Sequence, residues 1–145
     1  KGFQGSMMFN STEFNNVYNL IKNDELNEAN KILIKLRSFF FIHPDYLFLM
    51  SLFLLKSNRI YLAIDTALLS LKVDNTEAVL KKHGYEKSSE ELIEERYLFL
   101  ISLFRKIKIL ELADFLETIM KKKNPTSFLL HLEKIMPGIR LKNKL

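Results

Sequence analysis

The amino-acid sequence predicts an all-α domain. Apolar residues recur at helical spacing along most of the chain, and there are only four glycines and three prolines. An all-β domain needs many turns with positive φ and normally uses more glycine than this. Hydrophobic residues make up 48% and charged residues 27% of the 145 residues, as in a soluble globular domain with a single core. Residues 1–6 resemble a cloning remnant ahead of Met7 or Met8, so the domain is expected over 8–136.

The first two predicted helices are separated by a polar break at residues 23–24. Before the break, the spacing i, i+3, i+4, i+7 gives one apolar face to a helix. The residues of this face are Phe14, Val17, Tyr18 and Ile21. After the break, the next apolar face consists of Leu26, Ala29, Ile32, Leu33 and Leu36.

The next two predicted helices meet at a break over residues 57–58. Pro44 is expected in the first turn of the earlier helix, because the missing N–H would have no partner there in any residue. That helix is predicted to run to about Lys56. The later helix covers 60–73, with Ala63, Ala67 and Leu71 on one face.

The segment 74–88 is less regular and is predicted to be an insertion. A short helix is expected over 76–82, with Gly84 as its C-cap. Ser88 and Glu91 have the spacing of a capping box and predict a new helix that reaches about Phe104. Further helices are predicted over 109–122 and 126–135, and the basic tail 137–145 is expected to be flexible.

An internal repeat is visible within these helices. Tyr46–Phe53 reads YLFLMSLF and Tyr97–Phe104 reads YLFLISLF, with seven of eight positions identical at an offset of 51 residues. A short break follows each copy, and then a helix that carries an alanine, Ala63 or Ala113. Ala29 precedes Ala63 by 34 residues, which is the length of some helix-turn-helix repeats. We therefore expect both octapeptides to occupy equivalent inner positions in neighbouring helix pairs.

This pattern resembles the tetratricopeptide repeat, a unit of two helices with small residues where the helices touch. In the pair that begins near Pro44, the small residues are Ser51 on the first helix and Ala63, Ala67 and Ser70 on the second. In the pair that begins near Arg96, they are Ser102 and Ala113, and Pro125 lies where the family often has a closing proline.

The chain also departs from the family pattern. Asn75 stands where another closing proline would lie, and Glu117 stands where a large apolar residue is usual. The first pair matches well only around Ala29. The resemblance implies a right-handed α-solenoid of about three helix-turn-helix pairs, completed by a C-terminal capping helix.

The resemblance further implies a module that binds a partner protein or peptide in a groove lined by the first helix of each pair. Such a module would act as a scaffold, as an adaptor, or as an assembly or secretion chaperone, and a second copy of the chain is another candidate partner. The groove positions that match the family are Asp45, Phe48, Leu52, Leu55, Lys56, Arg96, Phe99, Leu103 and Lys106.

The residue types argue against an enzyme, a cofactor or a metal site. Cysteine is absent, which excludes disulfides, thiolate catalysis and cysteine-ligated zinc and leaves the compartment undetermined. His43, His83 and His131 are far apart in sequence and are expected to have structural roles. No glycine-rich phosphate loop occurs. The acidic run Glu90, Glu91, Glu94 and Glu95 lies at the start of a predicted helix, where it opposes the helix dipole and is expected to be solvated.

The net charge of +5 is concentrated at the C-terminal end. Seven basic residues and one acidic residue occur from Lys121 onward. The alternative function is therefore binding of nucleic acid or an anionic surface by this segment, although a solvated tail is favoured. The basic patch consists of Lys121, Lys122, Lys123, Arg140, Lys142 and Lys144.

Aromatic residues are numerous, with twelve phenylalanines and five tyrosines. Phe39, Phe40 and Phe41 are consecutive, and a helix cannot direct three successive side chains into one core, so one is expected to be partly exposed. An exposed aromatic patch would be a natural partner site. The apolar stretch 39–55 contains His43, Pro44 and Asp45, which do not suit a membrane span.

Overall fold

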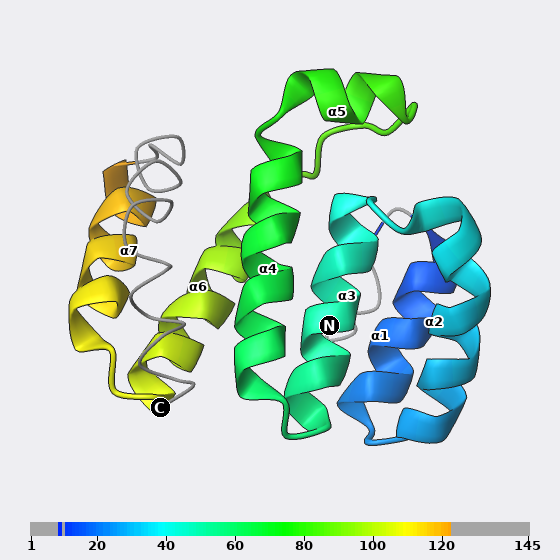
Figure 1. The fold of residues 1–145 in the computed structure, drawn as a ribbon, viewed down its shortest axis with the longest axis horizontal. Helices are drawn as coiled ribbons and strands as arrows, with labels where there is room; N and C mark the ends of the chain where they lie inside the picture. Colours follow the sequence, from blue (N-terminus) through cyan, green and yellow to red (C-terminus); the bar gives the residue numbers. More distant parts are fainter. Residues whose placement is uncertain (1–8, 10, 123–145) are drawn as a thin grey trace. The chain divides into compact units, whose positions relative to one another are not determined.

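The computed structural model describes residues 9 and 11–122, and this part of the chain is all-α, as the sequence predicts. It contains seven helices and no strand, and the helices of the pairs α1–α2, α3–α4 and α6–α7 turn back on each other (Figure 1). The predicted breaks near residues 23 and 57 both separate helices. The last predicted helix and the tail lie outside the described residues. The helices are α1 Thr12–Lys22, α2 Leu26–Phe40, α3 Pro44–Lys56, α4 Ile60–Asp74, α5 Glu77–Lys82, α6 Glu90–Lys106 and α7 Leu110–Lys122.

The described residues form two compact units, which divide between Arg96 and Tyr97. In the first unit, α3 packs most extensively against α4 and also contacts α1 and α2. In the second unit, Arg105 of α6 forms ion pairs with Asp114 at 3.3 Å and Glu117 at 2.8 Å, both on α7.

Three helix pairs are joined by the same kind of turn. The turns follow α1, α3 and α6, each has three residues, and the middle residue adopts positive φ: Asp24 at 60°, Asn58 at 62° and Lys108 at 66°. The next residue then donates its N–H to a carbonyl five positions earlier, at 2.8 Å or 2.9 Å. This is the Schellman arrangement, which satisfies helix carbonyls that would otherwise lack a partner.

Each of these turns leads to an alanine at the same place in the next helix. Ala29, Ala63 and Ala113 are all fully buried, and each is the fourth residue of its helix. A side chain of this size lets neighbouring helices approach closely. The repeat that the alanines indicate in the sequence therefore corresponds to a repeated turn and a repeated buried position.

Replacing Lys108 with glycine is expected to stabilise the protein. Lysine at positive φ is strained by about 1 kcal/mol, whereas glycine adopts this conformation freely. Relief of this strain exceeds the entropy that glycine adds to the unfolded chain, so urea denaturation should show a gain of up to about 1 kcal/mol for Lys108→Gly. Asn58→Gly is the matched control and should change stability less, because asparagine tolerates the left-handed region. A loss of stability in Lys108→Gly would contradict the turn geometry.

The short helix α5 also ends in a Schellman turn, as Gly84 predicts. Gly84 has φ +68°, and Tyr85 donates its N–H to the Leu80 carbonyl at 2.9 Å. Leu80 packs with Leu47 of α3 and Val73 of α4, which holds α5 against the end of that helix pair. The predicted insertion thus contains a helix with its own apolar contact.

The start of α6 differs from the predicted capping box. Ser89 caps the helix, because its Oγ accepts the N–H of Leu92 at 3.3 Å and its carbonyl accepts the N–H of Ile93. Placing the cap at Ser88 was therefore wrong by one residue. Ser88 is instead held by two buried carboxylates, which the sequence spacing does not indicate.

The two octapeptides are both helical, but their surroundings differ. Leu47 is buried, whereas its counterpart Leu98 is 44% exposed. Ser51 is fully buried, whereas Ser102 is exposed. The expectation of equivalent inner positions is therefore wrong at these two places. The first copy is enclosed because α3 contacts α1, α2 and α4.

Candidate functional site

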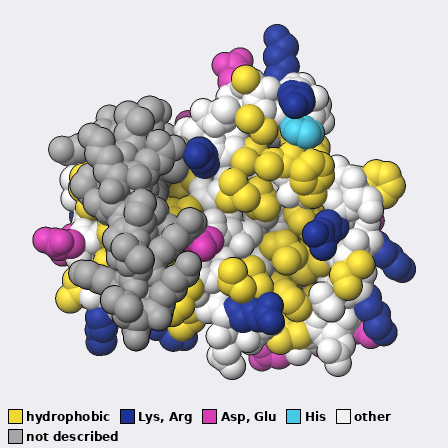
Figure 2. All heavy atoms as spheres, in the orientation of Figure 1, with side chains coloured by type: hydrophobic (Ala, Val, Ile, Leu, Met, Phe, Trp, Pro, Cys, Tyr) yellow, Lys and Arg dark blue, Asp and Glu magenta, His cyan; other side chains and the backbone are white. Residues whose placement is uncertain are grey.

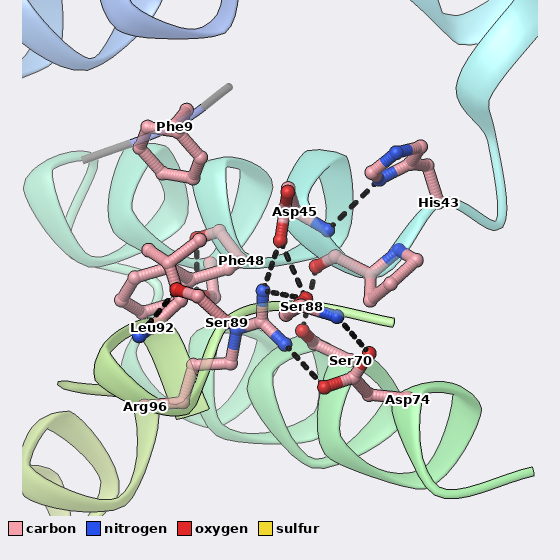
Figure 3. A network of polar contacts seen from close by, with 12 residues as sticks. Phe9, His43, Asp45, Phe48, Ser70, Asp74, Ser88, Ser89, Leu92 and Arg96 are labelled. Atoms are coloured by element: carbon pink, nitrogen blue, oxygen red, sulfur yellow. Dashed lines mark hydrogen bonds and ion pairs between the residues drawn. The ribbon is translucent and has the colours of Figure 1, made fainter. Parts of the chain in front are cut away.

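A network of polar contacts in the first unit surrounds the buried guanidinium of Arg96 (Figure 3). Nη2 of Arg96 donates to Asp45 Oδ1 and to Ser88 Oγ, the latter at 2.8 Å. Nη1 lies 3.4 Å from Oδ2 of Asp74. The guanidinium carbon is also 5.5 Å from the ring centre of Phe48, within the range of a cation–π contact.

Ser88 connects the same two carboxylates. Its N–H donates to Asp74 Oδ1 at 2.8 Å, and its hydroxyl donates to Asp45 Oδ1 at 2.7 Å. Nearby, the hydroxyl of Ser70 donates to the Pro44 carbonyl at 2.6 Å. The network thus fixes the segment after α5 to the N-terminal end of α3 and the C-terminal end of α4.

Burial lowers the pKa of Arg96, and the negative charges of Asp45 and Asp74 act in the opposite direction. An arginine remains protonated in such an environment, so the site carries one positive and two negative charges. The charged groups already bind one another, and the side chains of Arg96 and Asp74 are fully buried. The arrangement is suited to holding helices together rather than to binding a substrate.

Asp45 and Arg96 each precede one copy of the octapeptide. They therefore occupy equivalent positions in the repeat, with opposite charges, and they form an ion pair with each other. In the sequence, these two residues are related only by the offset of 51 and by their opposite charges. Sequence reasoning missed the ion pair because both residues were assigned to the groove.

His43 caps α3 and has the structural role that the sequence predicts. Its Nδ1 accepts the N–H of Asp45 at 3.1 Å, which requires the neutral ring. Its ring centre lies 5.2 Å from that of Phe14 and 4.7 Å from that of Tyr85. Burial lowers the pKa of His43; the carboxylate of Asp45 opposes this shift, and the charge of Arg96 adds to it.

Replacing His43 with asparagine should reduce the loss of stability at mildly acidic pH. Because the pKa of His43 is lowered in the folded protein, the unfolded chain binds the proton more readily. The stabilisation by the neutral His43 ring is therefore complete above the unfolded pKa of about 6.5 and is lost as the pH falls through the folded pKa. Asparagine can cap α3 without titrating. Urea denaturation at pH 7.5 and 5.5 should show a smaller decrease for His43→Asn than for the parent. Equal decreases would contradict the proposed role of the neutral ring.

Four of the nine predicted groove residues are not exposed. Asp45, Phe48, Arg96 and Leu103 are buried, so their assignment to a groove surface is corrected: they belong to the interior. Asp45 and Phe48 are buried because α3 packs against α1, α2 and α4. Arg96 is buried where it forms an ion pair with Asp45. The remaining five are half-buried or exposed. They are Leu52, Leu55 and Lys56 in the first unit, and Phe99 and Lys106 in the second.

Large apolar side chains are exposed elsewhere. Phe39 is 73% exposed and Phe41 is 54% exposed, which confirms that the three consecutive phenylalanines do not all enter the core. Phe41 contacts the ring of His83, with centres 5.7 Å apart, and the Phe39 carbonyl accepts the hydroxyl of Tyr85 at 2.9 Å. Other exposed apolar side chains are Ile34, Tyr61, Leu62 and Leu69 in the first unit, and Leu98 and Leu110 in the second.

The charged runs are only partly within the described residues. The four glutamates at positions 90, 91, 94 and 95 are exposed, as expected of a solvated acidic face. Lys121 is exposed and pairs with Glu117 at 3.6 Å. Lys122 ends α7, and nothing further is described of its side chain. The other predicted basic residues, Lys123, Arg140, Lys142 and Lys144, lie outside the described residues, as does His131.

Within the described residues, no helix combines the length and apolar character needed to cross a membrane. The same part of the chain contains no group of three or more acidic or histidine side chains arranged to hold a metal ion. Comparisons with protein-family models, curated proteins and solved structures find no match to this chain.

Proposed function

We propose that this protein is a binding module for another protein, built from helix pairs that resemble tetratricopeptide repeats. The observation that carries this proposal is the set of exposed large apolar side chains, above all Phe39 at the end of α2 and Phe41 directly after it. Burying one such side chain in a complex is worth roughly 1.5–3 kcal/mol. A scaffold that leaves several of them in water is suited to partner binding.

A right-handed solenoid arrangement of the helix pairs is part of the proposal. The first two turns support it, because Asp24 and Asn58 lie 34 residues apart and have nearly the same φ. Repeat modules of this kind commonly present extended binding surfaces and act as scaffolds, adaptors or chaperones. The groove that was expected from the octapeptides is not needed for this function, since the apolar side chains listed above are exposed on other helices.

Capture of partners from a lysate of the source cells tests the proposal. The full chain is immobilised and compared with two variants, Phe39→Ser with Phe41→Ser, and Tyr61→Ser with Leu62→Ser. All four side chains are at least 47% exposed, so both variants should fold like the parent. We expect the parent to retain a partner that at least one variant loses. Failure of the parent to retain any protein, or equal retention by all three chains, would contradict the proposed function.

A further inference from the structure

We propose that the end of the first unit formed by the α2–α3 turn and α5 binds an acidic peptide segment with apolar anchor residues. This deepens the function proposed above and presupposes it. We call this surface the basic aromatic end. It consists of Phe39, Phe41 and His83, with the cations Arg37, Lys81 and Lys82.

The aromatic part of the surface is held together by contacts between distant segments. The hydroxyl of Tyr85 donates to the Phe39 carbonyl, which joins the chain after α5 to the end of α2. The rings of His83 and Tyr85 are stacked with centres 5.6 Å apart, and Phe41 meets His83 edge-on. The backbone at Phe39 and the ring of Phe41 are therefore each held by a contact with the segment after α5, which lowers the entropy cost of binding.

The exposed charged residues that are close to these rings in sequence are mostly cations. Arg37, near the end of α2, precedes Phe41 by four residues, and Lys81 and Lys82 immediately precede His83. All three cations are exposed. The nearest acidic positions in sequence on α5 and after it are Glu77 and Glu86. Figure 2 shows a histidine among hydrophobic side chains near α5, with dark-blue basic side chains close by.

Charge also distinguishes between the candidate occupants. A second copy that docked symmetrically through this surface would bring like charges together, which is unfavourable. The C-terminal segment of this chain, with seven basic residues and one acidic residue from Lys121 onward, has the same sign as the surface. A separate acidic segment offers complementary charge, and its apolar side chains would cover Phe39 and Phe41.

Selection from a phage library of random 12-residue peptides tests this inference. The immobilised full chain is the target, at physiological salt, and the selected peptides are then synthesised and measured by fluorescence anisotropy. We expect peptides with net negative charge and at least one aromatic or large aliphatic residue. Phe39→Ser with Phe41→Ser should weaken their binding at least tenfold, and Lys81→Gln with Lys82→Gln should weaken it severalfold and reduce its salt dependence.

Asn16→Ser with Asn27→Ser is the control, because it changes two exposed polar side chains outside the set of exposed apolar residues and should leave the affinity unchanged. The inference would be overturned if the selected peptides were basic or uncharged, or if they bound the Phe39 and Phe41 variant with the same affinity as the parent. Either result would leave the proposed function standing. A parent dimer that the same variant converts to a monomer would also overturn it. Absence of both selected peptides and captured proteins would contradict the proposed function itself.

Discussion

Replacing Arg96 with methionine is expected to destabilise the protein by about 3–5 kcal/mol. The substitution keeps much of the side-chain volume but leaves the carboxylates of Asp45 and Asp74 buried without their cation. Taking an unpaired charge out of water is among the most costly changes in a protein interior. Urea denaturation at neutral pH measures the effect directly.

Neutralising the two carboxylates should restore much of this loss. In the triple variant Arg96→Met, Asp45→Asn, Asp74→Asn, no charge is buried, and each amide oxygen can still accept a bond from Ser88. We expect the triple variant to recover more than half of the lost free energy of unfolding. If the free energy of unfolding of Arg96→Met lay within about 1 kcal/mol of that of the parent, the buried ion network would not stabilise the fold.

Replacing Ala63 with phenylalanine is expected to cost about 1–3 kcal/mol. Ala63 is fully buried on α4, the helix that packs most extensively against α3, and a ring at this position would force the two helices apart. The midpoint of urea denaturation should fall accordingly.

The matched control for this substitution is Ala78→Phe. Ala78 is exposed on α5, so the same change of residue should alter stability by less than about 0.5 kcal/mol. If Ala63→Phe and the parent had the same midpoint of urea denaturation, Ala63 would not lie at a close contact between helices.

Much of the fold follows from local patterns. The apolar spacing of Phe14, Val17 and Ile21 identifies α1, and all three side chains are buried. Pro44 occupies the first turn of α3, and Gly84 closes α5 at positive φ, as their backbone preferences predict. These features depend on residues that are close in sequence.

The candidate site was harder to predict, because burial depends on contacts between distant helices. Phe48 was placed in a groove from the family pattern, but α3 has neighbours on several sides and Phe48 is buried. Arg96 follows four exposed glutamates, and local sequence gives no sign that it enters the interior. The three consecutive phenylalanines did indicate that one of their side chains is exposed, since a helix cannot direct three successive side chains into one core.

The central claim is that a partner protein docks against the exposed aromatic side chains at the end of α2. Photo-crosslinking in the source cells tests it most directly, with p-benzoylphenylalanine at position 41 of the full chain and, as a control, at the exposed position of Asn16 on α1. We predict a light-dependent adduct with a distinct partner from position 41 and none from position 16. Adducts of equal yield from both positions, or none from position 41, would contradict the claim.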